Sequence, residues 1–124
     1  MNTAVLDDAL ALAGFDRSGM LEAIASLPAQ LRDGWARTRG LTLPAPHRGA
    51  HSVAVLGMGG SAIGADLVRG IFGERLRVPL ITIRDYELPA FAGPGTLGVA
   101  SSYSGATEET IAALATALER KCPV

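Results

Sequence analysis

The sequence predicts an α/β protein in which a parallel β-sheet forms the middle layer of a three-layer sandwich behind N-terminal helices. In the second part of the chain, short apolar runs alternate with helical patterns, and the runs show no polar alternation. Strands of this kind are buried on both faces, as in parallel sheets covered by helices. Two of the runs also lead into turns rich in glycine and serine. The expected topology is flavodoxin-like, similar to that of nucleotide-binding domains.

The composition is that of a folded protein. The chain has 124 residues, of which 48% are hydrophobic and 19% charged, with a net charge of −1. A length near this favours one domain, and the balanced charge argues against a nucleic-acid partner. The apolar run over 53–60 is far shorter than the ~20 residues that span a bilayer. The single cysteine excludes an intrachain disulfide. We therefore expect a soluble, cytoplasmic protein with no membrane partner.

Residues 1–46 are expected to form N-terminal helices and a linker. The pattern predicts a helix over 3–13, and Ser18 is the expected N-cap of a second helix. An apolar stripe then continues at helical spacing past Pro28, and we expect its side chains to be core. The stretch over 41–49 contains two prolines and predicts an extended linker. The stripe consists of Met20, Leu21, Ile24, Leu27, Leu31 and Trp35.

Residues 47–124 are expected to form the α/β part. Strands are predicted over 52–56, 78–83 and 97–100, with helices over 61–72 and 106–121. The chain ends where a fourth strand should begin, so we expect an incomplete domain, truncated before that strand. The side chains expected to face the sheet are Ile63, Leu67, Ile71 and Phe72 on the first helix, and Ile111, Leu114, Ala115 and Leu118 on the second.

Two loops join strand ends to helices and carry the candidate chemistry. The first is GMGGSAIG over 57–64, and the second is SSYSGAT over 101–107. Ligands of open α/β sheets bind beyond the carboxyl ends of the strands. Glycines allow backbone N–H groups to approach an anion, and helix N-termini favour negative charge. Neither loop contains Lys or Arg. The pair therefore predicts a phosphate cradle built from amides and hydroxyls.

A nicotinamide dinucleotide (NAD) is an alternative ligand for the first loop. Gly57, Gly59 and Ala62 match the pattern G-x-G-x-x-A of Rossmann domains, and Asp85 ends the second expected strand, where a ribose-binding acid belongs. The second, serine-rich loop has no role in binding a pyrophosphate, which argues against this alternative.

Structural explanations exist for several of these residues. Ser104 or Thr107 by itself is explained as a helix N-cap. His47 and His51 lie in or beside the linker, where surface or turn positions are favoured, and Cys122 is most simply a small core residue. We expect no metal and no cofactor.

Taken together, GMGGSAIG over 57–64 and SSYSGATEET over 101–110 resemble the sugar isomerase (SIS) domain family. Within it, the sequence is most similar to the bifunctional phosphoglucose/phosphomannose isomerase group, and the helix over 27–35 agrees less specifically. The resemblance implies an intramolecular oxidoreductase that interconverts glucose 6-phosphate or mannose 6-phosphate with fructose 6-phosphate. It implies that this chain is the N-terminal portion of such a protein.

The resemblance also implies roles for individual residues. Ala106 departs from the asparagine expected in the second motif, which weakens the subgroup assignment more than the phosphate site. The family's carboxylate base, histidine and arginine lie beyond residue 124, so no catalytic residue is assigned and the chain is expected to be inactive alone. The family is dimeric, which implies a homodimer, and a non-catalytic SIS module that senses phosphosugars is a second alternative. The residues implied to hold the substrate phosphate are Gly60, Ser61, Ser102, Ser104 and Thr107.

Overall fold

The computed structural model describes residues 7–124, which belong to two compact units that meet in sequence between Thr42 and Leu43. The predicted helix over 3–13 falls partly on residues 1–6, outside the described range. The helices of the first unit are α1 (Ala9–Phe15), α2 (Met20–Ala25) and α3 (Leu27–Thr38). None of the helices within residues 7–124 has the length and apolar character needed to cross a membrane.

The start of α2 depends on Asp16. Its two carboxylate oxygens accept hydrogen bonds from the N–H groups of Met20 and Leu21, both at 2.7 Å. Gly19, the N-cap residue, has φ of 68° and so occupies the left-handed region that favours glycine. The expectation that Ser18 caps this helix was wrong, because its hydroxyl contacts only the Asp16 carboxylate, at 3.5 Å, among the described residues.

The apolar stripe of α2 and α3 is exposed, which corrects the expectation that these side chains are core. Trp35 is 69% exposed, and no side chain of α2 or α3 is buried in the described structure. Helical spacing places apolar residues on one face, but it carries no information on whether another element covers that face. The stripe residues that share this exposure are Met20, Leu21, Ile24, Leu27 and Leu31.

The second unit is built on a three-stranded parallel sheet, as predicted. Its strands are β1 (Ser52–Leu56), β2 (Leu80–Ile83) and β3 (Thr96–Ala100), in the order β2-β1-β3. Leu56 at the end of β1 lies opposite Ile83 on one side and Ala100 on the other. All three strands therefore end level with one another at the carboxyl edge. The predicted extended linker contains a short helix, α4 (Ala45–Arg48), whose first turn accepts proline.

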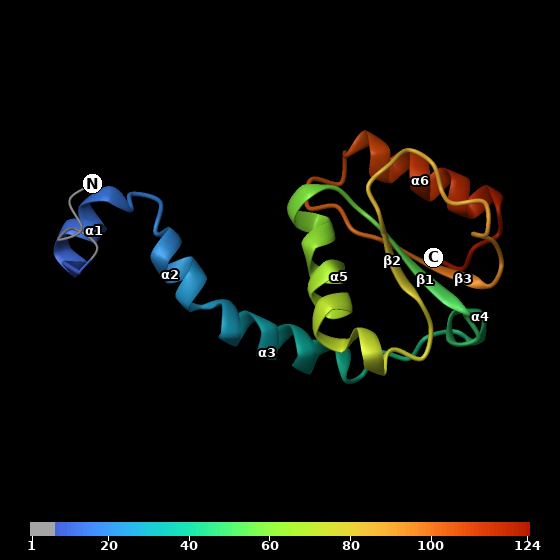
Figure 1. The fold of residues 1–124 in the computed structure, drawn as a ribbon, viewed down its shortest axis with the longest axis horizontal. Helices are drawn as coiled ribbons and strands as arrows, with labels where there is room; N and C mark the ends of the chain where they lie inside the picture. The colour runs from blue at the N-terminus through green and yellow to red at the C-terminus, as the bar shows by residue number, and fades with distance from the viewer. Residues whose placement is uncertain (1–6) are drawn as a thin grey trace. The chain divides into compact units, whose positions relative to one another are not determined.

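Helices cover both faces of the sheet, which confirms the predicted layered architecture. Helix α5 (Gly59–Phe72), followed by the 3₁₀ turn η2 (Gly73–Arg75), packs on β1 and β2, and α6 (Glu108–Glu119) packs on β1 and β3. Figure 1 shows the strands passing between α5 and α6. The main core lies under α6, where Ala54 and Leu56 of β1 are fully buried. Cys122 joins this core as the small buried residue expected.

The two helices present different faces to the sheet from those predicted. On α5 the buried side chains are Ala62 and Ala65, and on α6 they are Thr110, Ala113 and Ala117. Small side chains allow a helix backbone to approach a sheet closely, so the alanine face outcompetes the bulkier face. Of the residues expected to face inward, Leu114 is partly buried, and Ile63, Leu67, Ile71, Phe72, Ile111, Ala115 and Leu118 are exposed.

Replacing Asp16 with alanine is expected to unwind the start of α2, since the N–H groups of Met20 and Leu21 lose their acceptors. The hydrogen bonds from Leu21 and then Met20 hold the pKa of Asp16 below its ordinary 3.8. Its stabilising effect is therefore complete above about pH 4 and is lost as the pH falls through the lowered pKa. The amide NMR signals of Met20 and Leu21 report this titration, with D33N as the control. A midpoint at or above 3.8 would contradict the assignment.

Candidate functional site

Two loops leave the sheet side by side at its carboxyl edge. Gly57 follows β1 and Ser101 follows β3, and these strands are neighbours. The β1–β3 pairing continues into the second loop, because Ser101 N donates to Leu56 O at 2.8 Å, and Gly57 N of the first loop donates to Ile83 O of β2 at 3.1 Å. The order β2-β1-β3 reverses at β1, so this is the switch point at which open α/β sheets bind ligands.

The loops pass so close to each other at Gly57 that a side chain does not fit there. A Cβ atom built on Gly57 would lie 2.9 Å from the carbonyl oxygen of Ser101 and 3.6 Å from the backbone nitrogen of Ala62. Backbone atoms on both sides cannot move aside as the end of a flexible side chain can. The glycine is therefore required by close approach of the two loops.

The first loop presents the N-terminal end of α5. Met58 is the N-cap residue in an extended conformation, and no side chain of the described residues caps the helix. Gly59 has φ of 50°, in the left-handed region. The first N–H groups of a helix have no partner within the helix and carry partial positive charge. The exposed Gly60 therefore offers a backbone donor to an anion.

The second loop gathers three hydroxyl groups. The Oγ of Ser102 lies 3.0 Å from Thr107 Oγ1 and 3.5 Å from Ser104 Oγ, and the last two are 3.3 Å apart. Gly105 N donates to the Ser102 hydroxyl at 3.1 Å, and Ala106 N donates to the Ser104 hydroxyl at 3.2 Å. Thr107 is the N-cap residue of α6, one of the two positions expected, but no side chain in the described structure makes a capping hydrogen bond to this helix.

Ser61 joins the two loops. Its carbonyl oxygen accepts a hydrogen bond from the Ser101 hydroxyl at 3.0 Å, and its own hydroxyl accepts one from Tyr103 N at 3.3 Å. A cavity of about 590 Å³ opens between the loops. Gly60, Ser61 and Ser102 line it, whereas Ser104 and Thr107 connect to it through the hydroxyl cluster.

Two lining residues were not assigned from the sequence. Ser101 and Tyr103 both line the cavity and both bond to Ser61. Tyr103 contributes its backbone N–H to that bond, and no residue type signals a backbone contact in advance. The available signal for Ser101 was its place directly after a strand, at the edge where the loops meet.

The cavity lining is uncharged, and two carboxylates in the first turn of α6 raise the pKa of a tyrosine. Glu109 raises the pKa of Tyr86 above its ordinary 10.0, with further contributions from burial, Glu108 and Asp85. Negative neighbours disfavour the phenolate. Within residues 7–124, no group of three or more His, Cys, Asp or Glu residues is placed to hold a metal ion.

The structure does not bring Asp85 into the cavity between the loops. Asp85 lines a separate space of about 420 Å³ at the end of β2, and the two cavities share no lining residue. Its carboxylate accepts a hydrogen bond from Tyr86 N at 2.7 Å. A dinucleotide fingerprint needs its acidic residue on the ribose next to the glycine turn. Asp85 thus lies beyond the end of the strand that neighbours β1, but outside the lining of the cavity between the two loops.

Three curated relatives carry the same description, bifunctional phosphoglucose/phosphomannose isomerase. The protein of Caldicellulosiruptor bescii is 38% identical over 94 residues, which cover 76% of this chain and 28% of that protein. The protein of Thermoplasma volcanium is 41% identical over 61 residues, covering 49% and 19% of the two chains. The protein of Thermoplasma acidophilum is 33% identical over 73 residues, covering 59% and 23%.

No family model and no solved structure matches the chain. The similarity to the three relatives is partial, since the chain spans less than a third of the length of each. It agrees with the resemblance seen in the two loop motifs, and the three-stranded sheet flanked by helices is consistent with part of a sugar isomerase domain. By this partial similarity, the chain corresponds to a fragment of the bifunctional phosphoglucose/phosphomannose isomerases.

Proposed function

We propose that the cavity between the two loops binds the phosphate group of a hexose phosphate. The observation that carries this proposal is the convergence of the uncapped start of α5 and the hydroxyl cluster of the second loop on one uncharged cavity. Hydrogen bonds to a charged group contribute about 1.5–3 kcal/mol each. A helix N-terminus adds roughly 0.3–1 kcal/mol. Several such donors are enough to hold a dianion without a lysine or arginine.

The proposed roles follow the two sides of the cavity. Ser61 and the Gly60 N–H hold the phosphate from the first loop, and Ser102, Ser104 and Thr107 hold it from the second. In the described structure the three hydroxyls of the second loop contact one another. Each hydroxyl has a single proton to donate. Binding therefore turns these protons from their neighbours toward the phosphate oxygens.

We further propose that this portion serves an aldose–ketose isomerase acting on glucose 6-phosphate or mannose 6-phosphate, with fructose 6-phosphate as the product. The names of the three relatives and the paired loop motifs support this reaction. Such a reaction needs a base that moves a proton between C1 and C2 through an enediol. In this proposal residues 47–124 are the first part of a sugar isomerase domain, residues 1–46 are its N-terminal helices and linker, and the protein works as a cytoplasmic homodimer.

A phosphosugar-sensing module without catalysis is the second candidate, because such modules would use the same two loops. The uncharged cavity lining favours neither candidate over the other for binding, since both require phosphate recognition. The two candidates differ in whether the protein catalyses the isomerisation.

Replacing Thr107 with valine is expected to weaken binding of fructose 6-phosphate about tenfold to a hundredfold, because one hydrogen bond to a charged group is lost. Valine keeps the shape of threonine and removes the hydroxyl. The matched control is T116V on the same helix, where the hydroxyl donates to Ala112 O. Calorimetric titration at constant ionic strength measures both. Equal affinities for the two variants would count against the role of Thr107.

A panel of ligands tests the phosphate site against the dinucleotide alternative. Fructose 6-phosphate and inorganic phosphate are expected to raise the melting temperature of the chain, since a ligand that binds the folded state stabilises it. NAD is expected to leave the melting temperature unchanged. Stabilisation by NAD without stabilisation by fructose 6-phosphate would reverse the choice of ligand.

The purified 124-residue chain is expected to bind fructose 6-phosphate without converting it to glucose 6-phosphate or mannose 6-phosphate. The reason is that the residues lining the cavity include no carboxylate, histidine or arginine side chain. A coupled assay for either aldose phosphate measures conversion. Turnover by the chain alone would show that its base lies within these residues.

A further inference from the structure

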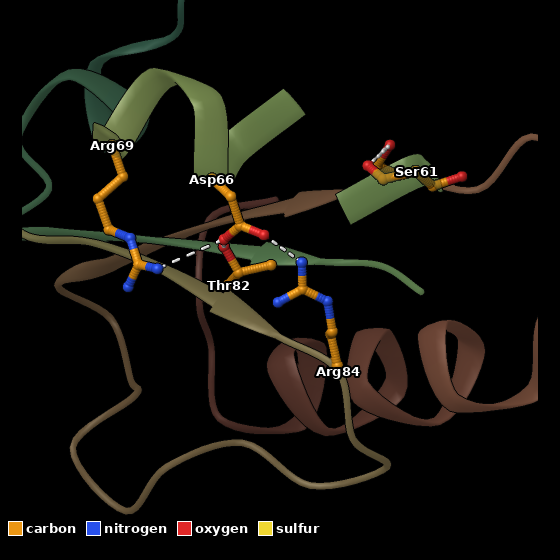
Figure 2. A network of polar contacts seen from close by, with 6 residues as sticks. Ser61, Asp66, Arg69, Thr82 and Arg84 are labelled. Atoms are coloured by element: carbon orange, nitrogen blue, oxygen red, sulfur yellow. Dashed lines mark hydrogen bonds and ion pairs between the residues drawn. The ribbon is translucent and has the colours of Figure 1, made fainter. Parts of the chain in front are cut away.

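A polar network ties α5 to β2. Asp66 lies on α5, and its Oδ1 accepts a hydrogen bond from the Thr82 hydroxyl at 2.8 Å. The second carboxylate oxygen pairs with the guanidinium of Arg84. Arg69, one turn further along α5, approaches the same carboxylate at 3.6 Å. Figure 2 shows the side chains of Thr82, Arg84 and Arg69 converging on Asp66.

The packing of α5 on the sheet is otherwise built from small side chains. Its buried residues are Ala62 and Ala65, while larger residues such as Leu67 lie on exposed positions. Alanine has a single methyl group and interdigitates little, so it allows a helix to rotate or slide on a sheet. A carboxylate held by two donors is directional, because each bond has a preferred distance and angle. Asp66 therefore adds a directional contact between α5 and β2.

Both donors come from one side of β2 and its immediate continuation. Thr82 and Arg84 are two residues apart, and side chains at this spacing point to the same side of a strand. Thr82 is part of β2, and Arg84 follows its last residue at the carboxyl edge of the sheet. The network thus connects α5 to the end of β2, beside the level at which Gly57 leaves β1.

The position of α5 on the sheet determines where the first loop contacts the second. Ser61, in the first turn of α5, reaches the loop after β3 through its bonds with Ser101 and Tyr103. The helix is therefore held at two points, by Asp66 to β2 and by Ser61 to the second loop. If α5 moves on the sheet, the N–H of Gly60 and the hydroxyl of Ser61 move away from the second loop.

We propose that Asp66 is a positioning residue of the phosphate site, which acts through Thr82 and Arg84 to hold the N-terminal turn of α5 against the second loop. This inference rests on the proposed phosphate binding. It assigns Arg84 to the carboxylate of Asp66, and it assigns neither residue to the phosphate itself.

The substitution Asp66→Asn tests the proposal by the sign of its effect on affinity. It keeps the shape of the side chain and removes its negative charge. Coulomb's law alone predicts tighter binding of an anion when a nearby negative charge is removed. Loss of positioning predicts the opposite, and we expect inorganic phosphate and fructose 6-phosphate to bind about threefold to tenfold more weakly. Tighter binding by D66N would overturn the proposal and would indicate that a released Arg84 contacts the phosphate.

A double-mutant cycle connects the effect to Arg84. R84Q is expected to weaken phosphate binding as D66N does, and the double variant is expected to be no weaker than either single variant, because both remove the same link. The matched control is D33N, which removes the carboxylate of the exposed Asp33–Arg37 pair on α3 and is expected to leave the affinity unchanged. Additive losses from D66N and R84Q would contradict a shared action.

A measurement without ligand separates this inference from the proposed function. In D66N, the amide NMR signals of Gly60, Ser61 and Tyr103 are expected to shift, while those of Met20 and Leu21 in the first unit are not. T82V removes one donor only and is expected to shift the same signals, which keeps the test available if D66N is unstable. Unchanged Gly60 and Ser61 signals would overturn the positioning role. Shifted signals in a chain that binds no phosphate would overturn the proposed function instead.

Discussion

The parallel pairing of β1 with β3 is the constraint on which the site depends. Because the strands are parallel, neighbouring and in level register, their carboxyl ends open at one edge of the sheet. The hydrogen bond from Ser101 N to Leu56 O carries this pairing one residue into the second loop. Because Gly57 has no side chain, the backbones of the two loops can approach each other closely at this point. Without this register, the start of α5 and the hydroxyl cluster would not face one cavity.

The position of α5 results from a balance between weak packing and directional polar contacts. Ala62 and Ala65 let the helix approach the sheet but provide little interlocking. The carboxylate of Asp66 adds the direction, since two donors from the end of β2 converge on it. Hydrogen bonding by Arg84 and then by Thr82 keeps the pKa of Asp66 below its ordinary 3.8, so the charged link also persists into mildly acidic solution. The geometry of the first loop thus depends on residues outside it.

The chemistry of the cavity suits the phosphate group that we propose it binds. Its lining offers hydroxyls and backbone amides and no formal charge. Such donors are oriented by the fold, whereas a lysine side chain would have to be ordered on binding. The carboxylates of Glu108 and Glu109 lie in the first turn of α6, where the helix dipole favours them. In the proposed function, phosphate recognition therefore depends on the geometry of these donors more than on net charge.

The sequence by itself determined the fold class, the three parallel strands and the two loops, because apolar runs without alternation and Gly/Ser-rich turns are local signals. The resemblance of the two loop motifs to the sugar isomerase family also pointed to Ser61 and Ser102, which lie beyond the ends of β1 and β3. Only the tertiary structure decided which helix faces are buried. Hydrophobicity favoured Ile63 and Ile111, yet close approach of the helices to the sheet selects alanines such as Ala62 and Ala113. The roles of Asp66 and Ser101 also emerged only there, because both depend on contacts with residues 16 and 40 positions away.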